Sequence, residues 1–261
     1  MSKLGSRLAV VLPPVVLGIV LLVAWEQWVV LNDIKPYLMP KPSAIRTQFG
    51  LLDDVIRRSA WITGKNAVIG LFFGILVGVA MALVASRLRF FRDMVTPVSA
   101  ALNAVPLIAI TPILNNAIGG GTSQLGRRIV VALVVFFPIF VNTLKGLSQV
   151  DPTHAELMRS YAASSNALSR KVRVPNALPY FFTGFKVAAS GAVISAVVAE
   201  YFGGPQGGLG YFIATNAAQS RTPQAWSFVV AACAMGLSFF LLAVALERVA
   251  MPWRAKQSAA G

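Results

Sequence analysis

Long apolar runs that recur along the chain restrict its fold more than any other feature. A run of roughly 20 residues is the length that an α-helix needs to cross the hydrocarbon core of a bilayer. Six such runs can be placed, at residues 8–31, 66–86, 95–118, 129–147, 180–201 and 226–246. They lack the alternation of apolar and polar residues that a transmembrane β-barrel shows. The runs therefore predict an all-α integral membrane protein with six transmembrane helices.

The charge content agrees with a bilayer environment. Only 12% of the 261 residues are charged, against roughly 25% in soluble domains. The formal net charge is +14, but the basic residues collect near the ends of the apolar runs, where topology and anionic lipid account for them. No basic surface interleaved with aromatic residues accompanies them. We therefore expect contact with membrane lipid and no nucleic-acid partner.

The even number of predicted spans places both termini on one side of the membrane. That side also holds residues 151–175 and carries more lysine and arginine than the other, so we expect it to be cytoplasmic. The predicted organisation is an N-terminal transmembrane helix over residues 1–34, an extracytoplasmic Pro-rich segment with an amphipathic helix over 35–63, a five-helix core over 64–247, and a cytoplasmic tail over 248–261.

A few small and polar residues stand out inside the predicted spans. Gly70, Gly74 and Gly78 repeat at intervals of four, which forms a flat stripe for close helix packing. Polar residues and helix-kinking prolines at membrane depth are candidates for a translocation pathway. The candidates that we select are Pro106, Asn115, Asn116, Ser195 and Glu200.

Several chemistries are not expected from this sequence. The single histidine and single cysteine, His154 and Cys233, predict neither a metal site nor an internal disulfide. No constellation of nucleophile and base suggests an enzyme. The glycine-rich stretches GGGTSQLG and GGPQGGLG lack the lysine of a phosphate-binding loop, so no ATP site is expected in this chain. An ion-coupled secondary transporter remains an alternative, although Glu26 and Glu200 are the only carboxylates near membrane depth.

Residues 151–175, DPTHAELMRSYAASSNALSRKVRVP, form a polar segment between two apolar runs. Asp151 suits the N-cap of a helix and Pro152 its first position, while Thr153 and Glu156 have the spacing of a capping box that starts two residues later. A helix this short is not stable alone, and Pro175 is expected to end the basic stretch that follows. The segment predicts either a docking helix for a partner or an ordinary loop.

The same segment resembles the cytoplasmic signature of permease subunits of ATP-binding-cassette (ABC) importers, which reads E-A-A, three residues, G, nine residues, I-x-L-P. Glu156-Leu157-Met158 stands in the place of E-A-A, and Val172 to Pro175 in the place of I-x-L-P. Ala162 stands where the signature has glycine. The stretches LMPKPSAI, AVPLIAITPIL, PNALPYFFTGFKVA, AEYFGG and GGLGYFI resemble the nitrate/sulfonate/taurine branch of these permeases.

The resemblance implies a type I ABC importer (MetI-like) permease fold in a bacterial cytoplasmic (inner) membrane. It implies pairing with a second permease copy, two cytoplasmic ATPases that bind ATP and Mg²⁺, and an extracytoplasmic solute-binding protein; this chain itself would hold no cofactor. The residues that would couple the permease to the ATPases are Glu156, Leu157, Met158, Arg159, Ala162, Ala163, Ser164 and Pro175.

The resemblance also limits the substrate class. Within the branch, EYFGGPQGGLG and TPQAWSF are similar to permeases for thiamine-precursor pyrimidines or riboflavin-like heterocycles. Sulfonates, taurine and nitrate are the alternative substrates of the branch.

Overall fold

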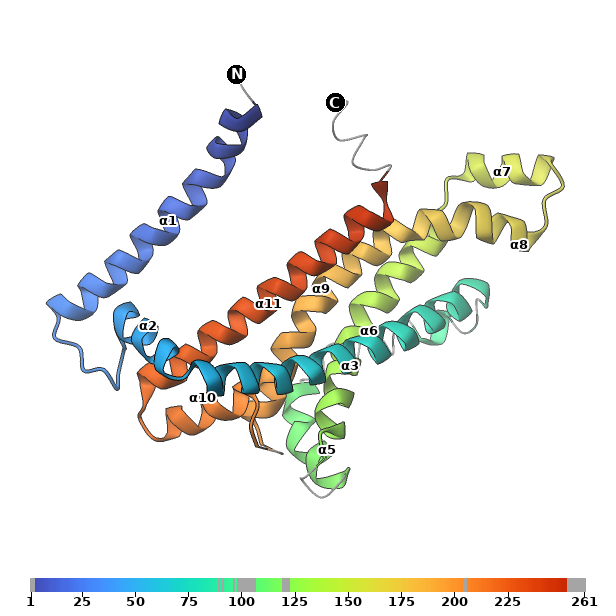
Figure 1. Ribbon diagram of the computed structural model, residues 1–261. Helices are drawn as coiled ribbons and strands as arrows, with labels where there is room; N and C mark the ends of the chain where they lie inside the picture. The colour runs from blue at the N-terminus through green and yellow to red at the C-terminus, as the bar shows by residue number, and fades with distance from the viewer. Residues whose placement is uncertain are drawn as a thin grey trace.

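In the computed structural model the chain is helical, and the part of the chain that the structure describes contains no strand (Figure 1). The structure describes residues 3–88, 90, 92–95, 97, 107–118, 123–203 and 206–252. The long helices are α1 (Lys3–Leu31), α3 (Asp53–Arg87), α6 (Leu125–Ser148), α9 (Val174–Tyr201) and α11 (Thr222–Ala250). The shorter elements are α2 (Pro42–Leu51), the 3₁₀ turn η1 (Leu107–Ile110), α5 (Thr111–Ala117), α7 (Pro152–Ser160), α8 (Ser165–Leu168), the π-helical turn η2 (Ser169–Arg173) and α10 (Leu209–Ala218).

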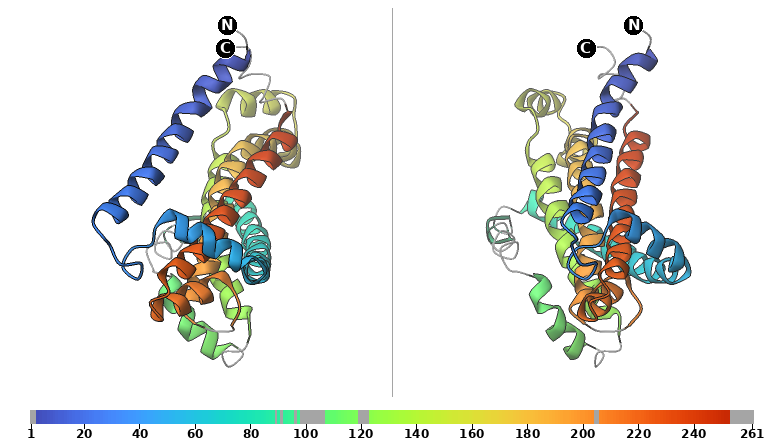
Figure 2. Two further views of the ribbon diagram at one scale, coloured as in Figure 1. Left: turned by 60° about the vertical axis from the view of Figure 1, so that its left-hand side comes forward. Right: turned by 90° about the vertical axis from the view of Figure 1, so that its left-hand side faces the viewer.

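The core lies where α3, α6 and α9 pack together. Its largest cluster joins Val131, Val135 and Ile139 of α6 to small residues of α9 that include Ala188 and Ala192. Helix α11 packs against α9 and α10, and Phe228 of α11 lies in a second buried cluster. Helix α1 stands apart from this bundle along most of its length (Figure 2). The buried residues of these clusters therefore all come from segments that follow residue 52.

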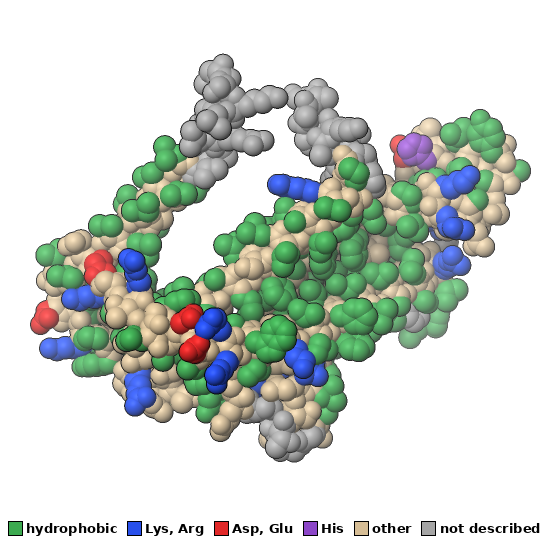
Figure 3. All heavy atoms as spheres, viewed as in Figure 1, with side chains coloured by type: hydrophobic (Ala, Val, Ile, Leu, Met, Phe, Trp, Pro, Cys, Tyr) green, Lys and Arg blue, Asp and Glu red, His purple; other side chains and the backbone are tan. Residues whose placement is uncertain are grey.

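Five described helical segments are long and apolar enough to cross a membrane: residues 12–31, 53–87, 125–148, 165–201 and 222–250. Apolar side chains cover the flanks of the long helices in Figure 3, and charged side chains gather near α2 and again around α7. This distribution confirms the predicted all-α membrane class. Of the six predicted spans, the third, at 95–118, lies partly outside the described residues, and its later part comprises η1 and α5.

The two ends of the molecule carry different elements. Helix α1 begins and α11 ends at the end that holds α7 and α8, which we call the α7 end (Figures 1 and 2). The opposite end, called the α10 end, holds α2, α5 and α10. This arrangement agrees with an even number of crossings, since the start of α1, the end of α11 and the polar segment 151–175 share one end.

The predicted amphipathic helix from Ser43 is split in two by the structure. Helix α2 ends at Leu51, and α3 begins at Asp53 and continues without interruption through the second predicted span. The predicted boundary between residues 63 and 64 therefore falls inside α3. Carboxylates are favoured in the first turn of a helix by the helix dipole, which accounts for a start at Asp53 and Asp54.

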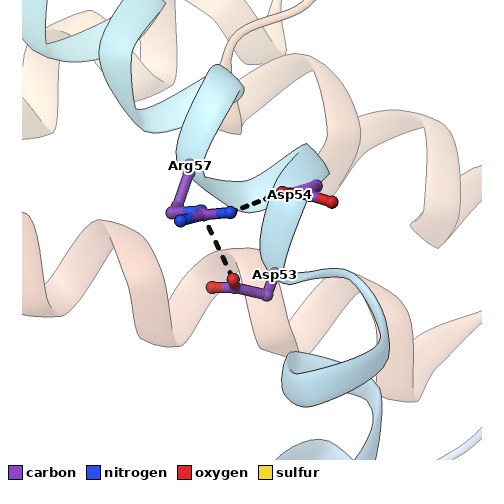
Figure 4. A network of polar contacts seen from close by, with 3 residues as sticks. All are labelled: Asp53, Asp54 and Arg57. Atoms are coloured by element: carbon purple, nitrogen blue, oxygen red, sulfur yellow. Dashed lines mark hydrogen bonds and ion pairs between the residues drawn. The ribbon is translucent and has the colours of Figure 1, made fainter.

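Asp53 and Asp54 both contact the guanidinium group of Arg57, which lies one turn later (Figure 4). The distance from Arg57 Nε to Asp53 Oδ2 is 3.3 Å. All three side chains are exposed, and exposed ion pairs contribute roughly 0–1 kcal/mol. The cluster is therefore a solvated helix start rather than a pair of catalytic carboxylates.

Glu26 joins α1 to the rest of the fold. Its carboxylate accepts hydrogen bonds from the Ser43 backbone N–H at 3.0 Å and from the Ser43 hydroxyl at 2.6 Å. Ser43 lies in the first turn of α2, where backbone N–H groups lack partners within the helix. Glu26 thus caps a helix that is distant from it in sequence.

Helix α10 is an element that the sequence analysis did not predict. It begins at Leu209, within the glycine-rich stretch GGPQGGLG. The final span begins at Thr222 rather than at 226. Pro223 lies in the first turn of α11, where a backbone N–H would have no partner within the helix, so proline is tolerated there.

The glycine stripe of α3 lies directly against α6. Gly70, Gly74 and Gly78 are buried, and a Cβ atom built on each would lie 2.5–2.8 Å from Val131, Val135 and Ile139 respectively. Only glycine allows the two backbones to approach this closely.

We expect Gly74→Ala to destabilise the protein by about 1–3 kcal/mol, because the added methyl group overpacks the contact with α6. The new Cβ would lie 2.5 Å from Val135 Cγ1 and 2.7 Å from the Ala132 carbonyl oxygen. Gly236→Ala is the matched control, since the nearest atom to its Cβ is 4.0 Å away and helix propensity favours alanine by about 1 kcal/mol. In thermal unfolding in the same detergent, the melting temperature should fall for Gly74→Ala and rise for Gly236→Ala. Equal changes in melting temperature would contradict the close-packing role of Gly74.

Candidate functional site

Residues 151–175, called the coupling segment after their predicted role, begin with a capped helix. The Thr153 backbone N–H donates to Asp151 Oδ1 at 2.8 Å, so Asp151 is the cap and Pro152 follows it. This backbone hydrogen bond, followed by a contact from the Thr153 side chain, lowers the pKa of Asp151 below its usual value. The stabilisation of the cap is therefore complete above the unfolded-state pKa and is lost as pH falls through the lowered folded-state pKa.

Helix α7 ends in a sharp left-handed turn at Ala162. The φ angle of Ala162 is +50°, and the Ala163 backbone N–H donates to the Met158 carbonyl at 3.0 Å. This six-to-one hydrogen bond is the mark of a Schellman C-cap, whose left-handed position is usually glycine. The turn that the glycine of the signature would favour is therefore present although alanine occupies its place.

Ala162→Gly should stabilise this turn by about 1 kcal/mol, because glycine adopts a positive φ without the steric cost of a Cβ atom. Hydrogen exchange at the Ala163 amide should slow by about fivefold, which is the same free energy expressed as a ratio. Ala167→Gly in α8 is the control with the opposite sign, since glycine costs about 1 kcal/mol in a regular helix. Unchanged or faster exchange at Ala163 in the Ala162→Gly variant would contradict the assignment.

The second half of the segment leads directly into α9. The Ser164 hydroxyl accepts the Ala167 N–H at 3.3 Å and so starts α8. The π-helical turn η2 follows, and Pro175 lies in the first turn of α9. The basic stretch ends at Arg173, two residues before Pro175, as expected. Pro175 does not interrupt the helical path, because the first turn of a helix does not require the N–H that proline lacks.

The coupling segment presents an exposed surface at the α7 end. Leu157 and Tyr161, one helical turn apart, are 53% and 76% exposed. Glu156 is exposed and makes no ion pair with any described residue. Met158 and Ala163 are half-buried, Ser164 and Pro175 are exposed, and the side chain of Arg159 is outside the described set. A charged group and two apolar side chains on a projecting helix suit contact with another protein.

A buried polar cluster lies at the α10 end and is centred on Glu200. Glu200 is 1% exposed, and its Oε2 accepts hydrogen bonds from Thr63 Oγ1 at 2.7 Å and from the Gly210 N–H at 3.2 Å. Thr63 Oγ1 in turn accepts the Leu209 N–H at 2.9 Å. Glu200 therefore joins α3, α9 and the start of α10.

Arg127 extends the same cluster from α6. Its fully buried side chain donates to the Gly203 carbonyl at 3.0 Å and to Gln124 Oε1 at 3.1 Å. Asn115 of α5 donates to the same Gly203 carbonyl at 3.1 Å. Gly203, which follows α9, is thus held by side chains of both α5 and α6. The cluster contains two buried residues of opposite charge type, Arg127 and Glu200.

The structure separates the predicted pathway residues. Asn115 and Glu200 both belong to the polar cluster. Ser195 is buried, but its hydroxyl donates to the Gly191 carbonyl of its own helix at 2.8 Å. Asn116 is exposed, and Pro106 lies outside the described residues. A role for these residues in a translocation pathway stays a prediction.

Sequence reasoning missed Thr63 as a hydrogen-bond partner of Glu200. It also missed Arg127 and its acceptor Gln124, which belong to the same cluster. The available signal was a carboxylate and an arginine at the ends of two spans on the same predicted side, since charges at membrane depth generally pair. Lys186 lies within the fifth predicted span, and its Nζ pairs with Oε2 of Glu247 in α11 at 2.7 Å.

Known proteins are similar in sequence to this chain over most of its length. The sequence profile of the family described as binding-protein-dependent transport system inner membrane component matches residues 74–254. The formylaminopyrimidine transport permease protein ThiX of Halalkalibacterium halodurans is 30% identical over 251 residues, which cover 94% of this chain and 97% of that protein. The riboflavin transport system permease protein RibX of Chloroflexus aurantiacus is 27% identical, with 90% and 87% covered.

The fold also matches a solved structure. The MetNI methionine ABC transporter in an inward-facing conformation aligns with a TM-score of 0.60, covering 76% of this chain and 97% of that chain. The sequence identity is 18%, so this likeness concerns the fold alone.

Proposed function

The chain belongs to the family of binding-protein-dependent transport system inner membrane components, and from this we propose that it imports a small heterocycle as one of two identical permease subunits. It is a permease subunit of an ABC importer. In the proposed assembly, two cytoplasmic ATPases bind ATP and Mg²⁺, and a solute-binding protein delivers the substrate from outside. The subunits would move substrate by alternating access.

The exposed α7 helix carries this proposal. Its surface holds Glu156, Leu157 and Tyr161 at the end away from the buried polar cluster. An apolar pair beside a carboxylate is a suitable contact for a groove on an ATPase, in which the apolar side chains would be buried. Closure of the ATPases would then move α7 together with α8 and the attached α9.

We propose that the α7 end is cytoplasmic and that the α10 end is extracytoplasmic. Arg87 in the last turn of α3 and the three basic residues of η2 support this orientation, since cytoplasmic loops carry an excess of basic residues. Both termini would then be cytoplasmic, in a bacterial inner membrane.

The proposed substrate is a thiamine-precursor pyrimidine or a riboflavin-like heterocycle. Support comes from the similarity to ThiX and RibX over at least 90% of this chain. A sulfonate, taurine or nitrate is the second candidate, because the wider branch that the sequence resembles transports these compounds.

A ligand screen of the partner binding protein tests the substrate class. We expect a formylaminopyrimidine or riboflavin to raise its melting temperature, with about 2.7 kcal/mol of stabilisation at a ligand concentration 100 times the Kd. Taurine and nitrate serve as the competing ligands. Stabilisation by taurine or nitrate alone would replace the heterocycle assignment.

Uptake by the reconstituted complex tests the transport class. We expect accumulation of substrate in proteoliposomes to require ATP, the ATPases and the binding protein together. Accumulation that is driven by an ion gradient without ATP would instead indicate a secondary transporter.

A further inference from the structure

A polar cavity of about 520 Å³ opens at the α7 end, between the coupling segment and the ends of the membrane helices. Its lining includes three arginines, Arg87 at the end of α3, Arg92 just beyond it and Arg173 in η2. The hydroxyl-bearing residues Ser148, Ser165 and Ser169 complete the polar wall. Four separate stretches of the chain thus contribute donors to one cavity.

The charges around this cavity are not balanced within the described part of the chain. Arg92 contacts Asp93 at 3.3 Å, and both side chains are exposed. Arg87 and Arg173 make no ion pair with any described carboxylate. No described aspartate or glutamate lines the cavity. At least two guanidinium groups are therefore available to an anion.

The donor set fits a phosphoryl group. A guanidinium group presents a planar fork of N–H donors that binds phosphate oxygens in pairs, and hydroxyl groups can donate to the remaining oxygens. The volume lies within the roughly 300–1,000 Å³ of small-molecule sites, so an attached organic group would also fit. An arginine cluster that serves only to orient the chain in the membrane needs no cavity.

We propose that this cavity binds a phosphoryl group at the cytoplasmic mouth of the permease. The group would come either from a soluble phosphate compound or from the headgroup of an anionic lipid. Because Arg87 belongs to the membrane bundle and Arg173 to the coupling segment, the bound group would bridge the two. The site is separate from the transport substrate and from the nucleotide of the ATPase.

Titration calorimetry on the full-length permease in phosphatidylcholine nanodiscs tests the site. The ATPase is omitted because its nucleotide site would itself bind phosphate. The probes are pyrophosphate and short-chain phosphatidylglycerol, at low ionic strength so that screening does not hide the interaction. We expect binding of one or both probes, weakened by about tenfold for each lost arginine in Arg87→Gln and Arg173→Gln.

Arg170→Gln is the matched control, since Arg170 lies in the same π-helical turn but does not line the cavity. It removes the same charge and should leave binding within about twofold of the unmodified permease. A double Arg87→Lys and Arg173→Lys variant keeps the charge but removes the forks, so it should bind more weakly than the unmodified chain and more tightly than the glutamine pair. Thermal unfolding without probe verifies that all variants are folded.

The outcomes separate the two sources of the phosphoryl group. Binding of pyrophosphate indicates a soluble ligand, and binding of phosphatidylglycerol alone indicates a lipid headgroup. Absence of binding by both probes would overturn the proposal, as would an equal loss of binding in Arg170→Gln and Arg87→Gln.

Discussion

Replacing Glu200 with leucine is expected to destabilise the permease by about 3–5 kcal/mol. This is the usual cost of removing a buried charged side chain when its polar partners stay buried. The variant leaves Thr63 Oγ1 and the Gly210 N–H without their common acceptor. It also leaves the fully buried Arg127 without the nearby negative charge. Thermal unfolding of the purified permease measures the loss.

Glu26→Leu is a sharp control for this prediction. Glu26 also accepts one backbone and one hydroxyl hydrogen bond, both from Ser43, but this site is exposed to solvent. Water can satisfy the released donors there, so we expect a loss of only about 0.5–1.5 kcal/mol. Glu200→Gln should fall between the two, because it retains an acceptor oxygen. If Glu200→Leu lowers the free energy of unfolding no more than Glu26→Leu does, the buried cluster does not stabilise the fold as we propose.

The sequence predicts the membrane helices well because hydropathy is a local property. Helices α3, α6, α9 and α11 each contain the apolar run expected for them. The spacing of Gly70, Gly74 and Gly78 identifies a close-packing face, but it does not identify α6 as the partner, because that depends on how the whole bundle assembles.

The polar cluster could not be assembled from the sequence. Thr63 and Glu200 are separated by 137 residues, and Asn115 and Gly203 by 88. No local pattern relates positions so far apart. The sequence identifies Glu200 only as a carboxylate at membrane depth. Its partners Thr63 and Gly210 are brought to it by the packing of α3 and of the start of α10 against α9.

The C-terminal turn of α7 shows a different limit. Sequence rules place glycine at a left-handed helix end, and Ala162 gives no such signal. The hydrogen bond from Ala163 to Met158 holds the turn and offsets the strain. Residue spacing, rather than residue identity, was the informative part of this motif.

Reversing the charge of Glu156 is expected to abolish coupling between the ATPases and transport. Glu156→Lys places a positive charge on the exposed face of α7, where we propose that the ATPase docks. Disrupting a charged contact in a protein interface costs about 2–5 kcal/mol, so ATP-driven uptake should fall by about 100-fold. Uptake and substrate-stimulated ATP hydrolysis in proteoliposomes are the measurements.

His154→Lys is the control, because residue 154 is also exposed on α7 but lies two positions away, on the opposite side of the helix. It introduces the same lysine side chain, with a charge change of +1 against +2 for Glu156→Lys, and leaves Glu156 in place. This variant should retain most of the uptake. Glu156 makes no ion pair with a described residue, so the Glu156→Lys permease should insert and unfold like the unmodified chain. Normal uptake in this variant would remove α7 from the coupling mechanism, whereas equal losses in both variants would mean that added charge, rather than Glu156, disturbs docking.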